Sequence, residues 1–347
     1  MILKTFCAIS SIFFLGLTLV YGVNSITQQS LMTGEIIVVQ NKSAVSAYLA
    51  DRNIVKDMVK NGLIKLTNTK DIKEAFAKIA STNEVVGIKV FSSPGPFSGT
   101  RPAVVAALIS LMIESGFSPK NIIIWDKYLS DLQMSGYEKL ANELGVRIAG
   151  AVQSGYDESV YYDKPLIGNL IYGDLEFGKK VEGIGRKSYI SKLLTKEVKK
   201  IISIAPLLNH TIAGVCGHLF SITIGGVDNT FRFESSPERL NESVPEIFAL
   251  PIFSDRTMLF ITDALICQYE GGPESKLHYS IVPGKLMFSR DPVALDTISL
   301  IELNNQRIID GFKSTKPNFE MFNNASLLEL GISDTNKIRA ITINLQH

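Results

Sequence analysis

The sequence has little cysteine. Its 347 residues include three, Cys7, Cys216 and Cys267, and none of them lies in a Cys-x-x-Cys pair. An iron–sulfur cluster or a zinc site with four cysteine ligands is therefore excluded within this chain. Cys216 and Cys267 are either buried free thiols or a disulfide, because their separation in sequence does not show how closely their Cα atoms approach.

An excess of one charge is also absent. The formal net charge is +1, and the charged residues, 20% of the chain, form no basic block. This balance argues against nucleic acid or an anionic membrane surface as the main partner. No internal repeat or low-complexity tract is present. We therefore expect a globular protein whose partner is a small molecule, and the sequence leaves its oligomeric state open.

One long apolar run stands at the N-terminus. Residues 5–23 are almost wholly apolar, with Lys4 before them and a polar Asn-Ser pair after them. This order is typical of a signal peptide over residues 1–25, cleaved for instance after Gly22 or Ser25. The run is also long enough to remain as a membrane anchor. We expect an exported protein, periplasmic or extracellular, that touches the membrane only through this segment, with residues 26–347 forming a single α/β domain.

The clearest folding unit is a strand, a helix and a second strand. β-branched apolar runs at residues 85–91 and 121–125 flank an apolar helical segment at residues 102–115. Pro102 suits a first helical turn, and this order implies parallel pairing with a right-handed crossover. The predicted fold class is α/β, a mostly parallel central sheet flanked by helices, with a small insertion or β-hairpin at about residues 151–187.

Other segments extend this pattern. Apolar or alternating runs predict further strands at residues 35–39, 146–149, 201–205, 256–262, 285–288 and 337–345. Helical patterns are found at residues 43–62, 70–79, 136–144, 188–200, 236–248, 289–306 and 326–330. Asp291, directly before Pro292, is predicted to be a helix N-cap.

The loop at residues 92–101 is rich in glycine, proline and serine, but it matches neither a Walker A loop nor a G-x-G-x-x-G fingerprint. It places Thr100 and Arg101 at a helix N-terminus, where free N–H groups and the helix dipole attract anions. Lys89, near the end of the preceding strand, adds a positive charge. The hypothesis is that Lys89, Thr100 and Arg101 bind a small anion. The alternative is that Thr100 caps the helix and Arg101 faces solvent.

Residues 205–234 hold two of the four histidines, His210 and His218. They follow a predicted buried strand, and the carboxyl ends of such strands are where open α/β sheets bind ligands. If a helix follows His210, both rings lie on one side of a pocket. Asn209 and Asn229 are assigned to substrate binding in the same stretch. The alternative is that each imidazole only satisfies nearby backbone groups.

Carboxylates follow the later strands. Asp263 comes after the predicted strand at residues 256–262, and Glu270 lies in the glycine-rich turn beyond it. A carboxylate at a strand tip suits a general base or a metal ligand, and Glu270 is assigned to substrate binding. The alternative is that Asp263 caps the next turn. Asp296 lies in an apolar helical turn, where a carboxylate needs a partner.

The order of these segments resembles the bacterial and archaeal family called domain of unknown function 362. The matching stretches are VGIKVF, GTRPAVVAALISLMIESGF with NIIIWD, SIAPLLNHTIAGVCGHLF, ITDALICQYEGGP, SRDPVALDTISL and LLELGISDTNKIRAITI. Family members often carry a lysine shortly before the histidine and another in a following L-K-N. Here these positions read Leu-Asn209-His210 and Gly-His218-Leu, so the chain resembles a divergent member. Some relatives carry ferredoxin-like iron–sulfur segments, which the cysteine count rules out here.

These residues support two main functional hypotheses. The first is an enzyme acting on a small anionic substrate, in which Arg101 holds the anion and His210 or Asp263 moves a proton. His210, His218 and Asp296 would hold a divalent metal if one is present, since imidazole and carboxylate suit several transition metals. The second hypothesis is an exported protein that binds a ligand or metal without catalysis, and a purely structural role is a third.

Overall fold

The computed structural model describes residues 34–164, 187–234, 236–313 and 317–345. The predicted signal peptide, residues 165–186 of the predicted insertion and His347 lie outside these ranges. Within them, none of the helices is long and apolar enough to cross a membrane.

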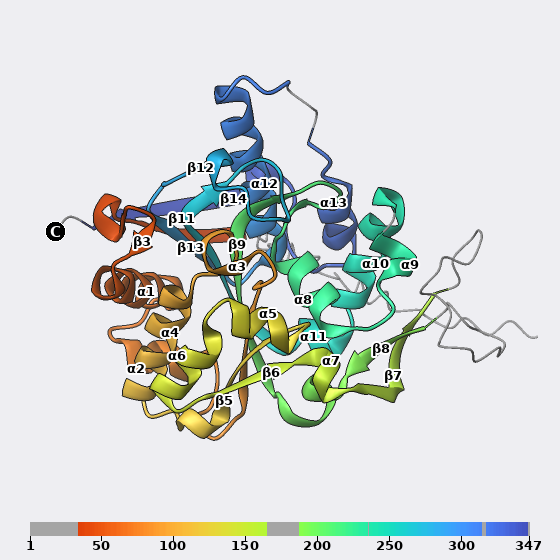
Figure 1. The fold of residues 1–347 in the computed structure, drawn as a ribbon, viewed down its shortest axis with the longest axis horizontal. Coiled ribbons are helices and arrows are strands. Elements are labelled where there is room, and N and C mark those ends of the chain that lie inside the picture. Colours follow the sequence, from red (N-terminus) through yellow and green to blue (C-terminus); the bar gives the residue numbers. More distant parts are fainter. Residues whose placement is uncertain (1–33, 165–186, 235, 314–316, 346–347) are drawn as a thin grey trace, which may run out of the picture. The chain divides into compact units, whose positions relative to one another are not determined.

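A central β-sheet organises the chain (Figure 1). Its strands follow the order β14-β1-β13-β11-β9-β4-β5-β6, with β10 beside β9 and β12 beside β11. Along this order β13 is antiparallel to both of its neighbours, and all other neighbouring pairs are parallel. The predicted mostly parallel α/β sheet is therefore confirmed. The strands are β1 (Gly34–Gln40), β4 (Val86–Val90), β5 (Ile122–Asp126), β6 (Arg147–Gly150), β9 (Lys200–His210), β10 (Gly214–Val215), β11 (Thr257–Gln268), β12 (Ser280–Ile281), β13 (Lys285–Ser289) and β14 (Ile338–Asn344).

The central strands are apolar on both faces because helices cover both sides of the sheet. β4 and β5 are buried at every position, as the Val and Ile residues that dominate both segments predict for parallel strands, and the one lysine of β4, Lys89, is buried as well. Successive residues of β5 alternate between two cores, with Ile122 and Ile124 on one face and Ile123 and Trp125 on the other. This alternation follows from the two-residue period of a strand.

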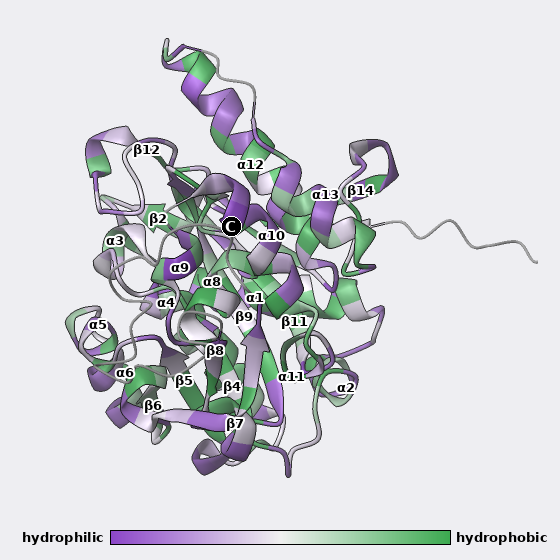
Figure 2. Cartoon of the chain, turned by 90° about the vertical axis from the view of Figure 1, so that its right-hand side faces the viewer, coloured by the Kyte–Doolittle hydropathy of each residue, from purple (hydrophilic) through white to green (hydrophobic). Residues whose placement is uncertain are grey.

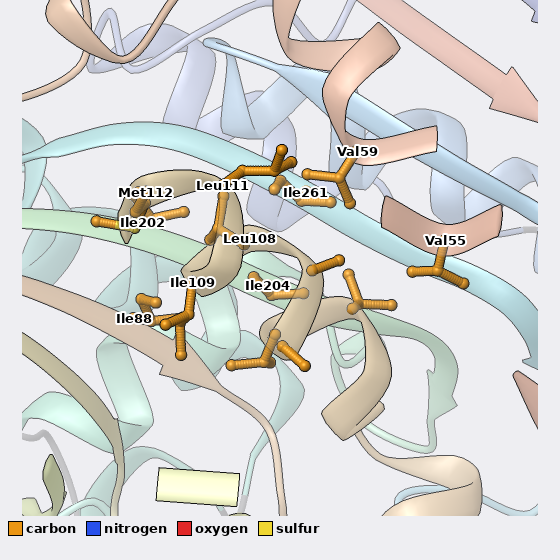
Figure 3. Packing of buried hydrophobic residues seen from close by; sticks show 14 of the residues in the cluster. Val55, Val59, Ile88, Leu108, Ile109, Leu111, Met112, Ile202, Ile204 and Ile261 are labelled. Carbon is orange, nitrogen blue, oxygen red and sulfur yellow. The ribbon is translucent and has the colours of Figure 1, made fainter. Parts of the chain in front are cut away.

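One face of the sheet packs against the first half of the helices. Figure 3 shows side chains of α1 and α4 meeting those of β4, β9 and β11, including Leu108 and Ile109 beside Ile88 and Ile204. The helices of this face are α1 (Arg52–Thr67), α2 (Ile72–Ala77), α4 (Pro102–Glu114), α5 (Leu129–Met134) and α6 (Tyr137–Leu144). They confirm most of the helices predicted in this part of the chain.

The opposite face packs against later helices. They are α8 (His218–Gly226), α10 (Pro237–Phe248), α11 (Pro251–Ser254), α12 (Pro292–Ile309) and α13 (Glu320–Leu327). Figure 2 shows α12 extending away from the sheet with hydrophobic and hydrophilic residues alternating along it. Asp291 caps α12 as predicted, because its side chain accepts a hydrogen bond from the Ala294 N–H at 2.8 Å.

Short elements fill the connections. They are β2 (Val45–Ser46), β3 (Leu49–Ala50), α3 (Gly95–Ser98), α7 (Ala151–Ser154), α9 (Phe231–Glu234) and the 3₁₀ turns Lys42–Ala44, Pro119–Asn121, Leu277–Tyr279 and Thr335–Lys337. The helix predicted from residue 43 begins only at Arg52, because Asp51 caps it by accepting from the N–H groups of Asn53 and Ile54.

The helix predicted at residues 188–200 is wrong. β8 (Lys187–Ser191) pairs antiparallel with β7 (Tyr156–Asp163), and a five-residue π-helical turn, Leu193–Glu197, follows. Cross-strand pairing outweighs the local helical pattern here, since aromatic residues such as Tyr189 and Tyr161 pair well between strands. The predicted insertion at about residues 151–187 thus contains β7, whereas β8 lies beyond it except for Lys187.

Two other local expectations concern the site. The condition that placed His210 and His218 on one side of a helix is not met, because the chain turns over residues 211–213 and β10 pairs back with β9 before α8 begins at His218. β11 does not end before Asp263 but continues to Gln268, so Asp263 lies inside the strand.

Candidate functional site

A cavity lies at the carboxyl ends of β4, β5 and β9. After β4 the chain adds β5 and β6 on one side, whereas β9 and β11 lie on the other side of β4. Such a switch in strand order opens a crevice at the carboxyl edge of an α/β sheet. The cavity measures about 250 Å³. Its lining residues are Phe91, Ser93, Asp126, Lys127, Tyr128, Asp131, His210, Phe220, Ser221, Ile224, Gly225, Thr230, Phe231, Glu234 and Pro273.

His210 is the last residue of β9 and has its ring fixed by the following turn. Its Nδ1 accepts hydrogen bonds from the N–H groups of Ile212 at 3.2 Å and Ala213 at 3.0 Å. Burial lowers the pKa of His210 to about 4, although Glu274 acts in the opposite direction. The imidazole is therefore neutral near pH 7 and carries its proton on Nε2. His210 also lines a second cavity of about 370 Å³.

Asp126 ends β5 and forms part of the cavity wall. Its Oδ2 accepts from the N–H and the hydroxyl of Ser92, each at 2.7 Å. Its Oδ1 accepts from Lys89 Nζ at 2.9 Å and from the Lys127 N–H at 2.8 Å. Four donors around one carboxylate hold it in a fixed orientation.

Three further charged side chains line the cavity. Lys127 donates from Nζ to the Thr230 hydroxyl at 2.8 Å, and burial lowers its pKa. Burial raises the pKa of Asp131, and the nearby charge of Asp126 adds to this effect. Glu234 has a buried Oε1 without a hydrogen-bond partner among the described residues. The cavity therefore has more carboxylates than ammonium groups.

Lys89 lies beneath the cavity and not in it. Its Nζ donates to the Val90 carbonyl at 2.6 Å, to Asp126 Oδ1 at 2.9 Å and to the Ser221 hydroxyl at 2.8 Å. These bonds use all the donors of the ammonium group. A Cβ on Gly225 would overlap the Lys89 side chain, so glycine is needed there for α8 to approach β4. Burial lowers the pKa of Lys89 against the opposing effect of Asp126.

Comparison with known proteins agrees with the resemblance seen in the sequence. The model of the family described as domain of unknown function 362 matches residues 86–300, more than half of the chain. The chain belongs to this family. All residues that line the cavity, from Phe91 to Pro273, lie within residues 86–300, the part of the chain that the domain of unknown function 362 model matches.

Comparisons beyond the family add little. A search of curated proteins found no match. Among solved structures, a crystal structure of a Thermotoga maritima protein is similar, with a TM-score of 0.42 and 11% sequence identity. The alignment covers 77% of this chain and 61% of that chain.

The anion-binding cluster predicted at Lys89, Thr100 and Arg101 is not assembled in this member of the family. Arg101 Nη1 lies 2.9 Å from Asp263 Oδ1, and the Arg101 N–H donates to Asp263 Oδ2 at 2.9 Å. Both side chains are buried, and Arg101 Nη2 also donates to the carbonyls of Phe97 and Ile266. Asp263 therefore lies inside β11 and not at its end, and its partner is the buried Arg101.

Thr100 joins two strands. Its hydroxyl donates to the Ile204 carbonyl at 2.7 Å and accepts from the Phe91 N–H at 3.0 Å. These bonds link the end of β4 to β9, so the side chain has no free group for a ligand. The alternative stated from the sequence is wrong as well, because Thr100 does not cap α4 and Arg101 is buried and does not face solvent.

The residues proposed as metal ligands have separate partners. His218 is fully buried, with Nδ1 2.8 Å from the Ser203 hydroxyl and Nε2 3.1 Å from the Thr262 hydroxyl, and burial lowers its pKa to about 3. Asp296 accepts from the N–H groups of His218 at 2.8 Å and Leu219 at 2.9 Å, which caps α8. Burial raises the pKa of Asp296 to about 7.

No metal-binding arrangement is found in the part of the chain that the structure describes. Within it, no group of three or more His, Cys, Asp or Glu side chains is placed to hold a metal ion. His210, His218 and Asp296 therefore do not form one ligand set. Cys216 and Cys267 are both buried free thiols, so the first of the two alternatives for them holds.

The remaining predicted contacts lie away from the first cavity. Asn209 accepts from the Gly272 N–H at 2.8 Å and lines the second cavity. Glu270 lines the same cavity and forms an ion pair with Arg307. Asn229 donates to the Lys187 carbonyl at 3.0 Å and has a positive φ of 48°, as in a turn.

Sequence reasoning missed Lys127, Asp131 and Glu234. Lys127 lies two positions after the strand predicted at residues 121–125, so its position near a strand end was a usable signal. Asp131 and Glu234 lie on short helices whose placement depends on the fold. Only the tertiary structure brings the two carboxylates to the cavity that contains His210.

Proposed function

We propose that this protein binds a small polar molecule in the cavity at the ends of β4, β5 and β9, and that His210 donates a hydrogen bond from Nε2 to it. The supporting observation is the pair of backbone N–H groups that hold His210 Nδ1 as an acceptor. With Nδ1 occupied, the neutral ring can offer a ligand only its Nε2 donor. The volume of about 250 Å³ lies below the ~300–1,000 Å³ of typical drug-sized sites, which favours a small ligand.

A catalytic role is the second candidate, and the presence of both His210 and Glu234 in the cavity wall favours it. The cavity is lined both by a neutral imidazole donor and by a carboxylate with one oxygen that has no partner among the described residues. A neutral donor can polarise a carbonyl group while a carboxylate takes a proton from the neighbouring carbon. In that reaction Glu234 would be the base and His210 the electrophile. Binding without turnover is the simpler function, and the same cavity serves both.

The binding function is tested by replacing His210 with asparagine. The asparagine side-chain oxygen can still accept from the turn N–H groups, as such side chains do in Asx-turns, but the residue lacks the Nε2 donor. A set of small carbonyl and amide fragments, including acetone and acetamide, is screened by saturation-transfer NMR against the full chain. We expect fragments that bind the wild type to lose about tenfold or more in affinity in His210→Asn, the loss expected for a hydrogen bond to a buried site.

The matched control is His278→Asn, since His278 is exposed and lies outside both cavities. It should leave fragment binding unchanged. Equal binding by wild type and His210→Asn, or a complete lack of fragment binding by the wild type, would contradict the proposal.

A further inference from the structure

The charge of the cavity identifies the class of ligand that it suits. Among described residues, its lining includes the carboxylates Asp126, Asp131 and Glu234 and the ammonium group of Lys127. Lys89 balances Asp126 from below through its 2.9 Å contact. The remaining lining charges leave an excess of negative charge. An anionic ligand would be repelled by this excess, whereas a cation would be attracted.

Glu234 supplies a specific place for a positive charge. Its Oε1 is buried and lacks a hydrogen-bond partner in the described ranges. An unpartnered buried carboxylate oxygen is costly, and a positively charged group beside it relieves that cost. Lys127 lies within electrostatic range of Glu234, but its Nζ is bonded to Thr230. A second cation is therefore the complement that this side chain lacks.

Aromatic rings form the other part of the wall. Phe91, Tyr128, Phe220 and Phe231 all line the cavity. The Phe220 ring centroid lies 6.3 Å from that of Phe91 and 4.5 Å from that of His210, so these rings form a continuous surface. Phe231 is 63% exposed, an unusual position for a large apolar side chain unless something covers it. The faces of such rings attract organic cations.

We propose that this cavity selects a small organic cation whose charged nitrogen lies among the aromatic rings and beside Glu234. The inference rests on the proposed binding function and names the ligand class for the same site. An oxygen atom at the other end of the ligand would accept the hydrogen bond from His210. The positive charges that the sequence suggested for an anion, those of Lys89 and Arg101, are already paired with Asp126 and Asp263.

The test compares two probes of the same shape by isothermal titration calorimetry with the full chain. Choline carries a trimethylammonium group and a hydroxyl, and 3,3-dimethylbutan-1-ol replaces the charged nitrogen with carbon. We expect choline to bind about tenfold or more tightly than the neutral alcohol, because only the cation gains from the rings and carboxylates. Glu234→Gln should reduce this preference severalfold, since it removes the charge and keeps the size.

Glu138→Gln is the matched control. Glu138 is an exposed residue of α6 that does not line the cavity, and its replacement removes the same charge as Glu234→Gln does. It should keep the wild-type preference for choline. If the neutral alcohol binds as tightly as choline, the cation proposal is overturned while the small-molecule function stands. If neither probe binds, the cation proposal is overturned and the fragment screen decides the binding function separately.

Discussion

At the residue scale, His210 and His218 show how position divides the roles of one side-chain type. Both imidazoles are neutral near pH 7, because burial lowers the pKa of His210 to about 4 and that of His218 to about 3. His218 has hydroxyl partners on both ring nitrogens and no exposed surface. Among the described residues His210 has backbone partners on Nδ1 alone, and it lines two cavities. We therefore assign the ligand contact to His210 and a structural role to His218.

The lowered pKa of His218 predicts a pH dependence of folding. The folded pKa lies below the unfolded value of about 6.5, so the unfolded chain binds a proton that the folded chain does not. The contribution to stability is fully present above about pH 6.5 and is lost as pH falls toward the folded pKa of about 3. Between pH 4 and 6, His218→Gln should lower the slope of unfolding free energy against pH by about 1.4 kcal/mol per pH unit.

Urea unfolding of wild type and His218→Gln at several pH values measures this slope. Comparing the two slopes cancels the contributions of groups that both proteins share, including Asp296, whose raised pKa acts in the opposite direction. His278→Gln is the control and should keep the wild-type slope. Parallel curves for wild type and His218→Gln would show that His218 is protonated in the folded protein.

At the scale of secondary-structure elements, buried polar pairs join strands to helices. Lys89 links β4 to β5 and to α8, and Asp296 links α12 to the first residues of α8. Arg101 and Asp263 link the start of α4 to β11. α8 is thus held from two sides, and it contributes Phe220, Ser221, Ile224 and Gly225 to the cavity. The shape of the cavity depends on these links.

The Arg101–Asp263 pair gives a prediction at this scale. Arg101→Leu should lower the free energy of unfolding by about 3–5 kcal/mol, because it leaves the carboxylate of Asp263 buried without its ionic partner. The exposed pair of Arg52 and Glu143, with N and O 2.8 Å apart, provides the control. Arg52→Leu should cost no more than about 1 kcal/mol, as surface ion pairs usually do.

Chemical denaturation of both variants distinguishes a structural from a functional role for Arg101. A structural role predicts the large difference between the two variants. If Arg101→Leu is as stable as Arg52→Leu, the arginine is not a structural anchor, and its assignment to ligand binding would have to be reconsidered.

At the scale of the whole molecule, the sheet gathers the cavity from distant parts of the chain. Its lining extends from Phe91, after β4, to Pro273, after β11. The strand order places the carboxyl ends of β4, β5 and β9 side by side, and the switch between β4 and β9 leaves the space between them. Membership of the domain of unknown function 362 family covers this whole region but names no activity.

Export is a prediction that belongs to the whole chain. The apolar run at residues 5–23 predicts that the protein leaves the cytoplasm and loses its first residues. N-terminal sequencing of the protein from its native cells should find a new N-terminus close to residue 23 or 26. An intact Met1 in an exported, membrane-bound protein would indicate an anchor instead, and an intact Met1 in the cytoplasm would contradict export.

Much of the fold was predictable because its signals are local. The Val and Ile runs of β4 and β5 specify buried strands, Pro102 marks the start of α4, and Asp291 caps α12. The errors arose where tertiary pairing outweighed local pattern, as in β8, where strand pairing with β7 replaces the predicted helix. The general location of the site, at strand ends near His210, was predictable. The other charged residues that line it, such as Lys127, Asp131 and Glu234, were not predicted.

The sequence by itself determined the α/β class, the parallel unit around α4, the family and the exclusion of a four-cysteine cluster. Each of these depends on residue type and short-range spacing. The tertiary structure decided which charges remain available to a ligand. Arg101 and Asp263 are 162 positions apart in the chain, and Lys89 and Asp126 are 37 apart, yet each pair is buried in direct contact. Such pairing depends on strand order and burial, and it is what leaves His210 and Glu234 to face the cavity.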